Sequence, residues 1–281
     1  MSKVETFFYP KSLDEALSIL ALKRGDVAPV AGSTAIGHLT GLRKRYLMGL
    51  GGLGLDTIEL HADRARLGAM VPLAALEAHD GLAAAFPSAS GRGVFRDVTR
   101  CLGSTLLRHM ITAGGNAFQV FAWSELPVVF LALDARFVLR RAEGERVLTA
   151  DELYAAHPRT ILRPDELLVA VEVPRGTTGL VYDRFSSAES EYCLVSLCLA
   201  RRPSGVRAVV GGLSTVPRHL PGLEAAFAAG APLPDGPALD ALIRADLPTL
   251  QAAQPYPPEY RLSVASGLLA EAARALHEVQ P

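Results

Sequence analysis

The chain has 281 residues, of which 49% are hydrophobic, 20% charged and 6% aromatic, and its 28 Lys and Arg residues face 29 Asp and Glu residues, for a net charge of −1. This composition excludes a disordered or fibrous protein, and the length allows one large domain or two to three smaller ones. The balanced charge offers no broad attraction to nucleic acid or anionic lipid, so neither is expected as a partner.

Few residues of the chain are suited to metal binding. The three cysteines, Cys101, Cys193 and Cys198, form no CxxC pair and are too few for a four-cysteine iron–sulfur or zinc site. The last two lie in an apolar run, where cysteine usually behaves as a small buried hydrophobe. The seven histidines show no metal-ligand spacing. We therefore expect no metal site in this chain.

No targeting or membrane segment is evident. The N-terminal residues lack the apolar stretch of a signal peptide, and no window reaches the 18 apolar residues that a membrane span requires. The sequence therefore predicts a cytoplasmic protein without a membrane span.

The N-terminal segment predicts a small α/β unit. Ser12, followed three residues later by a glutamate, is a helix-capping pattern, and Gly25 ends the helix. A short buried strand over 27–31 then runs into a turn of small residues over 32–37, and a second helix is expected over 38–45. Strand, small-residue turn and helix is an arrangement in which backbone N–H groups can face an anion.

The next segment is rich in glycine. Residues 46–55 lack the G-x-G-x-x-G spacing of a dinucleotide-binding loop, so they predict a strand and a turn instead. A strand is expected over 65–71 and a helix over 72–82. Residues 87–108 predict a mostly helical segment, although three glycines within it disfavour a continuous helix.

A second glycine-bearing turn, at 112–116, precedes an apolar stretch. Residues 126–133 suit a buried helix with Pro127 in its first turn. The pattern beyond it predicts a hairpin over 135–141 and 146–149, a short helix over 151–157 and a strand over 166–174.

A break in composition at 175–179 indicates a domain boundary. Strands followed by helices predict an α+β domain beyond it. The expected strands cover 180–186, 194–201 and 206–213, and the expected helices cover 223–229, 239–246 and 260–279.

The two small-residue turns, taken in order with their flanks, carry a resemblance to a known family. The turns read Ala31-Gly-Ser-Thr-Ala35 and Thr112-Ala-Gly-Gly-Asn116, and they are followed by Glu125-Leu-Pro127 and Leu131-Ala-Leu-Asp-Ala135. The chain resembles the FAD-binding subunit of molybdenum hydroxylases, which includes the medium subunit of aerobic carbon monoxide dehydrogenase and the flavin domain of xanthine dehydrogenase. That family has A-G-G-T-D and T-I-G-G-N turns, a D-L-P run and an L-A-L-D-A segment.

Further segments extend the likeness over nearly the whole chain. The opening over 8–17 is similar to the family's aromatic-x-P-x-S-L-x-E-A start, residues 164–174 to its G-E-L-L…V-P strand, and residues 211–217 to its late G-G-V-x-x-x-P turn. Arg108 stands where the family often has an arginine before the second turn.

The resemblance implies an α+β fold and a domain organisation. Two α/β subdomains of the vanillyl-alcohol-oxidase (PCMH) type, over 1–57 and 58–175, are expected to hold FAD without a covalent bond. A C-terminal α+β domain over 176–281, with a three-stranded sheet and helices, is expected to follow.

The resemblance also implies a role in electron transfer and a set of partners. A molybdenum cofactor is expected on a large subunit and two [2Fe-2S] clusters on a small one, and the complex is expected to be a dimer of heterotrimers. FAD on this chain would receive electrons from the clusters and pass them to an external acceptor. The subunit then needs no acid–base pair of its own, and no catalytic residue is expected.

The expected cofactor-binding residues come mainly from the two turns, because small residues let backbone N–H groups approach a diphosphate. From the resemblance we add an acid that accepts bonds from ribityl or ribose hydroxyls, and a tyrosine close to the isoalloxazine. Plain turn chemistry, a helix-terminal acid and a packing tyrosine are the alternatives for these residues. The full set is Ala31, Gly32, Ser33, Thr34, Ala35, Thr112, Gly114, Gly115, Asn116, Glu125 and Tyr192.

The chain departs from the family pattern at three places. Ser33 replaces a glycine, Ala35 replaces an aspartate, and the loop after the second turn carries Phe118, Phe121 and Trp123 in place of a small polar segment. The three aromatic residues can line the flavin, contact the iron–sulfur subunit or belong to the core. These departures leave a second hypothesis open, a flavin-poor scaffold subunit of the same kind of complex, and a third, a stand-alone oxidase.

Overall fold

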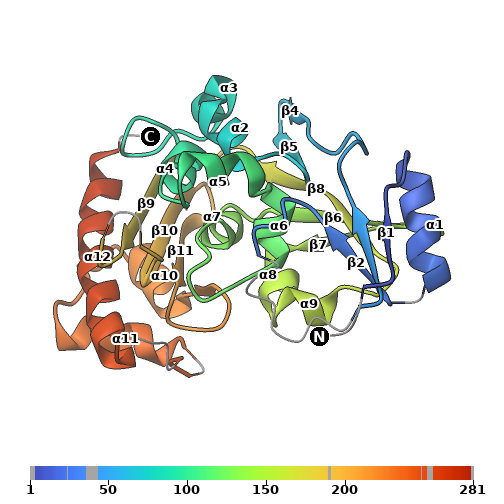
Figure 1. Cartoon of the computed structure of the whole chain (residues 1–281). Helices are drawn as coiled ribbons and strands as arrows, with labels where there is room; N and C mark the ends of the chain where they lie inside the picture. Colours follow the sequence, from blue (N-terminus) through green and yellow to red (C-terminus); the bar gives the residue numbers. More distant parts are fainter. Residues whose placement is uncertain are drawn as a thin grey trace.

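The computed structural model describes residues 4–23, 25–35, 44–188, 191–247, 249–251 and 256–279. Within these residues the strands form three sheets that follow one another along the chain (Figure 1). A three-stranded sheet uses residues 6–49, a five-stranded sheet residues 58–174, and a four-stranded sheet residues 179–219.

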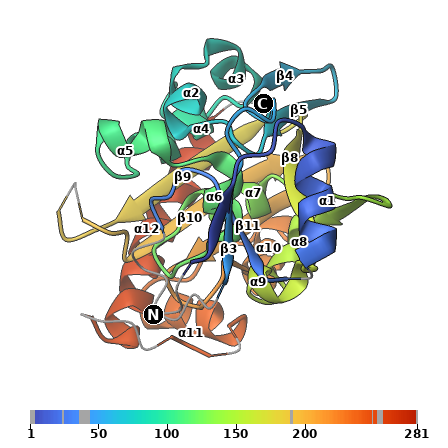
Figure 2. The ribbon, with the colours of Figure 1, turned by 45° about the vertical axis from the view of Figure 1, so that its right-hand side comes forward.

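The three-stranded sheet is parallel. Its order is β1 (Thr6–Phe8), β3 (Tyr46–Gly49) and β2 (Val27–Val30). Helix α1 (Leu13–Lys23) stands beside this sheet in Figure 2 and buries Leu17 and Leu20 with Met48. This small core fixes the direction in which β2 ends, where the first small-residue turn begins.

The five-stranded sheet is antiparallel, and its order is β4-β5-β8-β6-β7. The chain between β5 and β6 supplies most of the helices that pack near it. The strands of this sheet are β4 (Ile58–Leu60), β5 (Arg64–Gly68), β6 (Arg136–Arg141), β7 (Gly144–Thr149) and β8 (Leu167–Pro174). The helices are α2 (Leu73–Ala78), α3 (Asp80–Ala85), α4 (Val94–Arg100), α5 (Thr105–Met110), α6 (Ala113–Phe118), α8 (Ala150–Tyr154) and α9 (Pro158–Ile161).

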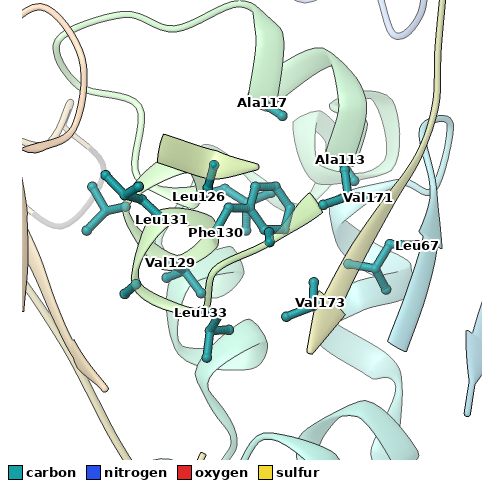
Figure 3. Close-up of a cluster of buried hydrophobic side chains, with 14 of the residues drawn as sticks. Leu67, Ala113, Ala117, Leu126, Val129, Phe130, Leu131, Leu133, Val171 and Val173 are labelled. Carbon is teal, nitrogen blue, oxygen red and sulfur yellow. The ribbon is translucent and has the colours of Figure 1, made fainter. Parts of the chain in front are cut away.

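Helix α7 (Leu126–Ala132) lies at the centre of the molecule, and all seven of its residues are buried. Figure 3 shows the Phe130 side chain directed toward Val171 of β8. Helix α7 also packs against β10 and β11 of the third sheet, so one apolar helix joins the two larger sheets. A helix that is apolar on every side is stable in water only when it is enclosed in this way.

The C-terminal sheet is antiparallel in the order β12-β11-β10-β9. Alternate residues of β10 face opposite cores: Leu197 and Leu199 belong to a cluster with the C-terminal helices, whereas Cys198 belongs to the cluster around α7. The strands are β9 (Gly179–Phe185), β10 (Val195–Arg202), β11 (Gly205–Gly211) and β12 (Arg218–His219), and the helices are α10 (Pro221–Ala228), α11 (Pro237–Ala245) and α12 (Pro258–Glu278).

Most of the elements expected from the sequence are present. Ser12 Oγ accepts the Glu15 N–H group at 3.1 Å at the start of α1, and the residues from Tyr46 onward form a strand and a turn, as predicted. The apolar stretch with Pro127 forms α7, and the predicted hairpin is β6 and β7.

The predicted boundaries of several helices and of one turn were wrong. The helix expected over 72–82 is divided between α2 and α3, because His79 has an extended backbone (φ −81°, ψ 99°) and its ring caps α3. Of residues 87–108 only α4 and α5 are helical, since Gly91 and Gly93 have φ values of +76° and +89°. The turn expected at 112–116 instead begins helix α6.

The C-terminal sheet has a fourth strand, β12, in addition to the three that were expected. β4 and α9 carry no clear signal in the sequence because each is very short. The helix expected over 38–45 lies largely outside the described residues, since these resume at Lys44.

Among the described residues, no helix is long and apolar enough to cross a bilayer. The same part of the chain contains no group of three or more His, Cys, Asp or Glu residues placed to hold a metal ion.

Candidate functional site

The two small-residue turns lie against each other. A Cβ atom added to Gly32 would stand 1.6 Å from the Met110 carbonyl oxygen, and one added to Gly115 would stand 3.9 Å from the Ala31 Cβ. The end of β2 therefore touches the chain that leads into α6, although some eighty residues separate them in the sequence. This close approach requires glycine at position 32, because any side chain would enter the backbone of α5.

The first turn presents backbone donors. Within the described residues, the N–H groups of residues 32–35 have no hydrogen-bond acceptor. Ser33 has φ +63°, a left-handed conformation that favours glycine. Backbone N–H groups around a left-handed residue can form a concave anion-binding surface.

The second turn is organised differently, because its N–H groups have acceptors within the chain. Gly114 donates to Ala69 O at 2.9 Å, Gly115 to Thr112 Oγ1 at 3.0 Å, and Asn116 to Thr112 O at 2.9 Å. Thr112 is thus the N-cap of α6. A phosphate contact for these N–H groups stays a prediction.

Glycine at position 114 serves packing. A Cβ atom there would stand 2.7 Å from Ala69 O, so only glycine lets α6 approach the end of β5. The neighbouring Asn116 carries a buried Oδ1 atom with no hydrogen-bond partner among the described residues. A buried polar atom of this kind is unfavourable unless a ligand or water satisfies it. The second turn therefore offers a side-chain amide to a ligand.

Glu125 lies at the N-terminal end of α7, and its carboxylate is held by protein groups. The side chain is 2% exposed, its Oε2 lies 2.8 Å from Nε of Arg184, and the Tyr182 hydroxyl donates to the same oxygen. Burial raises the pKa of this carboxyl to about 7, although Arg184 and Tyr182 act in the opposite direction. Glu125 thus joins α7 to β9 of the C-terminal sheet.

Tyr192 belongs to an aromatic stack, defined as Phe121, Trp123 and Tyr192. The Phe121 and Trp123 rings are stacked with centroids 4.8 Å apart, and the Trp123 and Tyr192 centroids are also 4.8 Å apart. Tyr192 is 56% exposed, and Phe121 and Trp123 are half-buried, so the stack reaches the surface. Phe118, in contrast, packs edge-on against Phe137 in the main core.

Residues of the site that the sequence did not reveal are Met110, Tyr182 and Arg184. Met110 contributes only a backbone oxygen, which leaves no mark in a sequence. Tyr182 and Arg184 alternate in a strand like many half-buried residues, and their pairing with Glu125 depends on tertiary structure.

Replacing Ser33 with glycine tests the conformation of the first turn. Ser33→Gly removes the left-handed strain of an L-residue, and we expect the free energy of unfolding to rise by about 0.5–1 kcal/mol, since part of the gain is offset by greater freedom of the unfolded chain. Urea denaturation measures this change. If Ser33→Gly is no more stable than the wild-type protein, Ser33 is not strained in the folded chain.

The sequence as a whole has informative relatives. Residues 2–176 match the family described as FAD binding domain in molybdopterin dehydrogenase. The carbon monoxide dehydrogenase medium chain of Afipia carboxidovorans is 28% identical over 94% of this chain and 93% of its own length. The nicotine 6-hydroxylase medium subunit of Paenarthrobacter nicotinovorans is 26% identical over 76% of this chain and 77% of its own length.

Solved structures share the fold. The structure of reconstituted CO dehydrogenase from Oligotropha carboxidovorans matches with a TM-score of 0.87 and 25% identity over 100% of both chains. Quinoline 2-oxidoreductase from Pseudomonas putida 86 matches with a TM-score of 0.84 and 20% identity over 99% of both chains, which shows a common fold. The expected α+β fold is thereby confirmed.

Proposed function

The chain belongs to the family of FAD binding domains in molybdopterin dehydrogenases, and from this premise we propose that it is the FAD-binding, electron-transferring subunit of a molybdenum hydroxylase complex. The observation that carries the proposal is the junction of the two turns. Among the described residues, the backbone N–H groups at 32–35 and the Asn116 Oδ1 atom at this junction have no hydrogen-bond partner. Donors to an anion and an acceptor for a hydroxyl or amino group are what a flavin dinucleotide requires.

The chemistry of the residues fits FAD. Neither turn contains a carboxylate that would repel a diphosphate. A hydrogen bond from a backbone N–H group to a charged oxygen contributes about 1.5–3 kcal/mol, so a few such bonds are sufficient for tight noncovalent binding. We assign the diphosphate to the N–H groups of Gly32, Ser33, Thr34 and Ala35.

The aromatic stack is proposed to face the isoalloxazine. Its rings reach the surface, and large flat side chains pack well against a ring system. FAD supplies the redox chemistry when it is bound, whereas the chain's own residues bind it, orient it and exclude water.

The proposed partners come from the relatives. Both curated relatives are named as medium chains or subunits, one of a carbon monoxide dehydrogenase and one of a nicotine hydroxylase. We propose a small subunit with [2Fe-2S] clusters as the electron donor, a large subunit with the molybdenum cofactor as the site of substrate oxidation, and an external molecule as the final acceptor.

Cofactor analysis of the purified native complex tests this function. We expect FAD in an amount equal to this chain, released by acid precipitation because it is not covalently bound, together with iron and molybdenum in two further subunits. A folded complex with iron and molybdenum but no flavin would favour the scaffold alternative, which the left-handed Ser33 and the internally bonded second turn make worth testing. Covalently bound flavin without partner chains would indicate a stand-alone oxidase.

A further inference from the structure

A buried ion pair connects the N-terminal end of α7 to β9 of the C-terminal sheet. Nε of Arg184 lies 2.8 Å from Oε2 of Glu125, and the two side chains are 11% and 2% exposed. Arg184 also donates from Nη2 to the carbonyl oxygen of Glu191 at 3.1 Å. The guanidinium therefore holds Glu125 at one end and the residue before Tyr192 at the other.

The aromatic stack is linked through the chain to both sides of this contact, to Glu125 through Phe121 and Trp123 and to Glu191 through Tyr192. Glu125 follows a tight turn in which Ser124 N–H donates to Phe121 O and Phe121 N–H donates to Ser124 Oγ, both at 2.9 Å. Phe121 and Trp123 belong to this turn, and Trp123 packs against Tyr192. The contacts thus form a closed ring that runs from Glu125 through Arg184, Glu191, Tyr192 and Trp123 back to Glu125.

We propose that Glu125 is a positioning residue: through Arg184 it fixes the segment that carries Tyr192, and thereby the geometry of the Phe121–Trp123–Tyr192 stack. The consequence for the cofactor rests on the proposed function, because the stack then presents a set surface to the isoalloxazine. The positioning itself concerns the chain alone and is testable without FAD.

Burial gives this contact a dependence on pH. The pKa of Glu125 is raised to about 7, with desolvation as the main cause, so the ion pair is complete only above neutrality. The groups that face the carboxylate are Arg184 and Tyr182 from β9, Cys193 before β10 and Cys101 after α4. Burial raises the pKa of both thiols and of the Tyr182 hydroxyl, so these three stay neutral near pH 7.

Trp123 is the single tryptophan of the chain, so its fluorescence reports on the stack alone. We expect the acrylamide quenching constant of the apoprotein to rise about twofold in Glu125→Gln as the half-buried ring becomes more exposed. The wild-type protein should show a change in quenching with a midpoint near pH 7, caused by Glu125, and Glu125→Gln should not. Unchanged quenching and an unchanged pH profile in a folded Glu125→Gln protein would overturn the proposal.

Two variants guard against a purely structural explanation. Glu166→Gln removes an equally buried glutamate, 1% exposed and paired with Arg146 at 2.7 Å, and we expect it to leave Trp123 quenching unchanged. Arg184→Lys keeps the charge but loses the planar group that reaches both Glu125 and Glu191, so we expect raised quenching with the midpoint retained. It also serves if Glu125→Gln does not fold, and wild-type quenching in Arg184→Lys would overturn the proposal.

A separate titration with FAD links the stack to the cofactor. In Glu125→Gln we expect FAD binding about tenfold weaker, equivalent to about 1.4 kcal/mol. If Trp123 responds to the variant but FAD affinity does not change, the positioning holds and the assignment of the stack to the isoalloxazine fails. If wild-type protein binds no FAD, the proposed function fails while the Trp123 measurements still decide the positioning.

Discussion

Replacing Gly32 with alanine is expected to abolish FAD retention. The new Cβ would stand 1.6 Å from the Met110 carbonyl oxygen, far inside van der Waals contact, and the obstacle is backbone that cannot rotate away. The first turn must then separate from the segment leading into α6, and the donors at 32–35 move away from Asn116. Loss of two charge-assisted bonds of about 2 kcal/mol each corresponds to a decrease in FAD affinity of roughly 1,000-fold.

Gly51→Ala is the matched control for this prediction. Gly51 lies in the glycine-rich segment after β3, and a Cβ atom there meets no atom of the described residues within 4 Å. Flavin absorbance of the protein after gel filtration and titration of the apoprotein with FAD measure the two effects. Wild-type affinity in a folded Gly32→Ala protein would show that the junction of the turns is not where FAD binds.

Sequence reasoning succeeded where local chemistry and the family pattern agree. The apolar stretch after Glu125 with Pro127 at its start allows little other than a buried helix, and α7 is that helix. For the same reason, the capping residue Ser12 and the alternating valines of β8 correctly predicted helix α1 and strand β8. Boundaries were wrong where a single backbone conformation decides them, as at His79, whose ring replaces a helical bond with a cap.

The candidate site was only partly accessible from the sequence. The order of the two turns in the sequence predicted that they belong to the cofactor site. Only the structure shows that Gly32 packs against the Met110 carbonyl group and that the Thr112 hydroxyl accepts the Gly115 N–H group. Glu125 is the sharpest case, because the sequence shows an acid before a proline and the structure shows a carboxylate paired with Arg184, which lies far along the chain. Pairing over such a distance leaves no local pattern to read.

The Glu125–Arg184 ion pair can position the aromatic stack without adding to the stability of the fold. A buried ion pair loses hydration on both partners, so it is often no more stable than a well-packed apolar substitute. The proposed role of this pair is therefore the geometry that it imposes. Glu166 shows the contrast. Its side chain is as little exposed to solvent, but it is less deeply enclosed by protein and receives bonds from both Arg146 and the Arg163 N–H group, and these bonds hold its pKa below the ordinary value despite desolvation.

The stability of the apoprotein is therefore expected to carry a pH dependence that comes from Glu125. Its pKa is about 7 in the folded chain against an ordinary value of 4.5, so the folded state binds the proton more tightly than the unfolded state. The contribution to the free energy of unfolding is fully present below about pH 4.5 and is lost as the pH rises through 7. Since one pKa unit corresponds to about 1.4 kcal/mol, this contribution amounts to about 3 kcal/mol.

Urea denaturation at intervals from pH 5 to pH 8 isolates this effect when wild type and Glu125→Gln are compared. Glutamine resembles the protonated carboxyl, so the two proteins should have similar stability at pH 5, and the raised pKa of Glu125 predicts that Glu125→Gln is the more stable at pH 8 by up to about 3 kcal/mol. Other titrating groups act equally in both proteins and cancel in the difference. If wild type is instead the more stable protein at pH 8, the attraction to Arg184 outweighs the loss of hydration, and the pair stabilises the fold as well as positioning the stack.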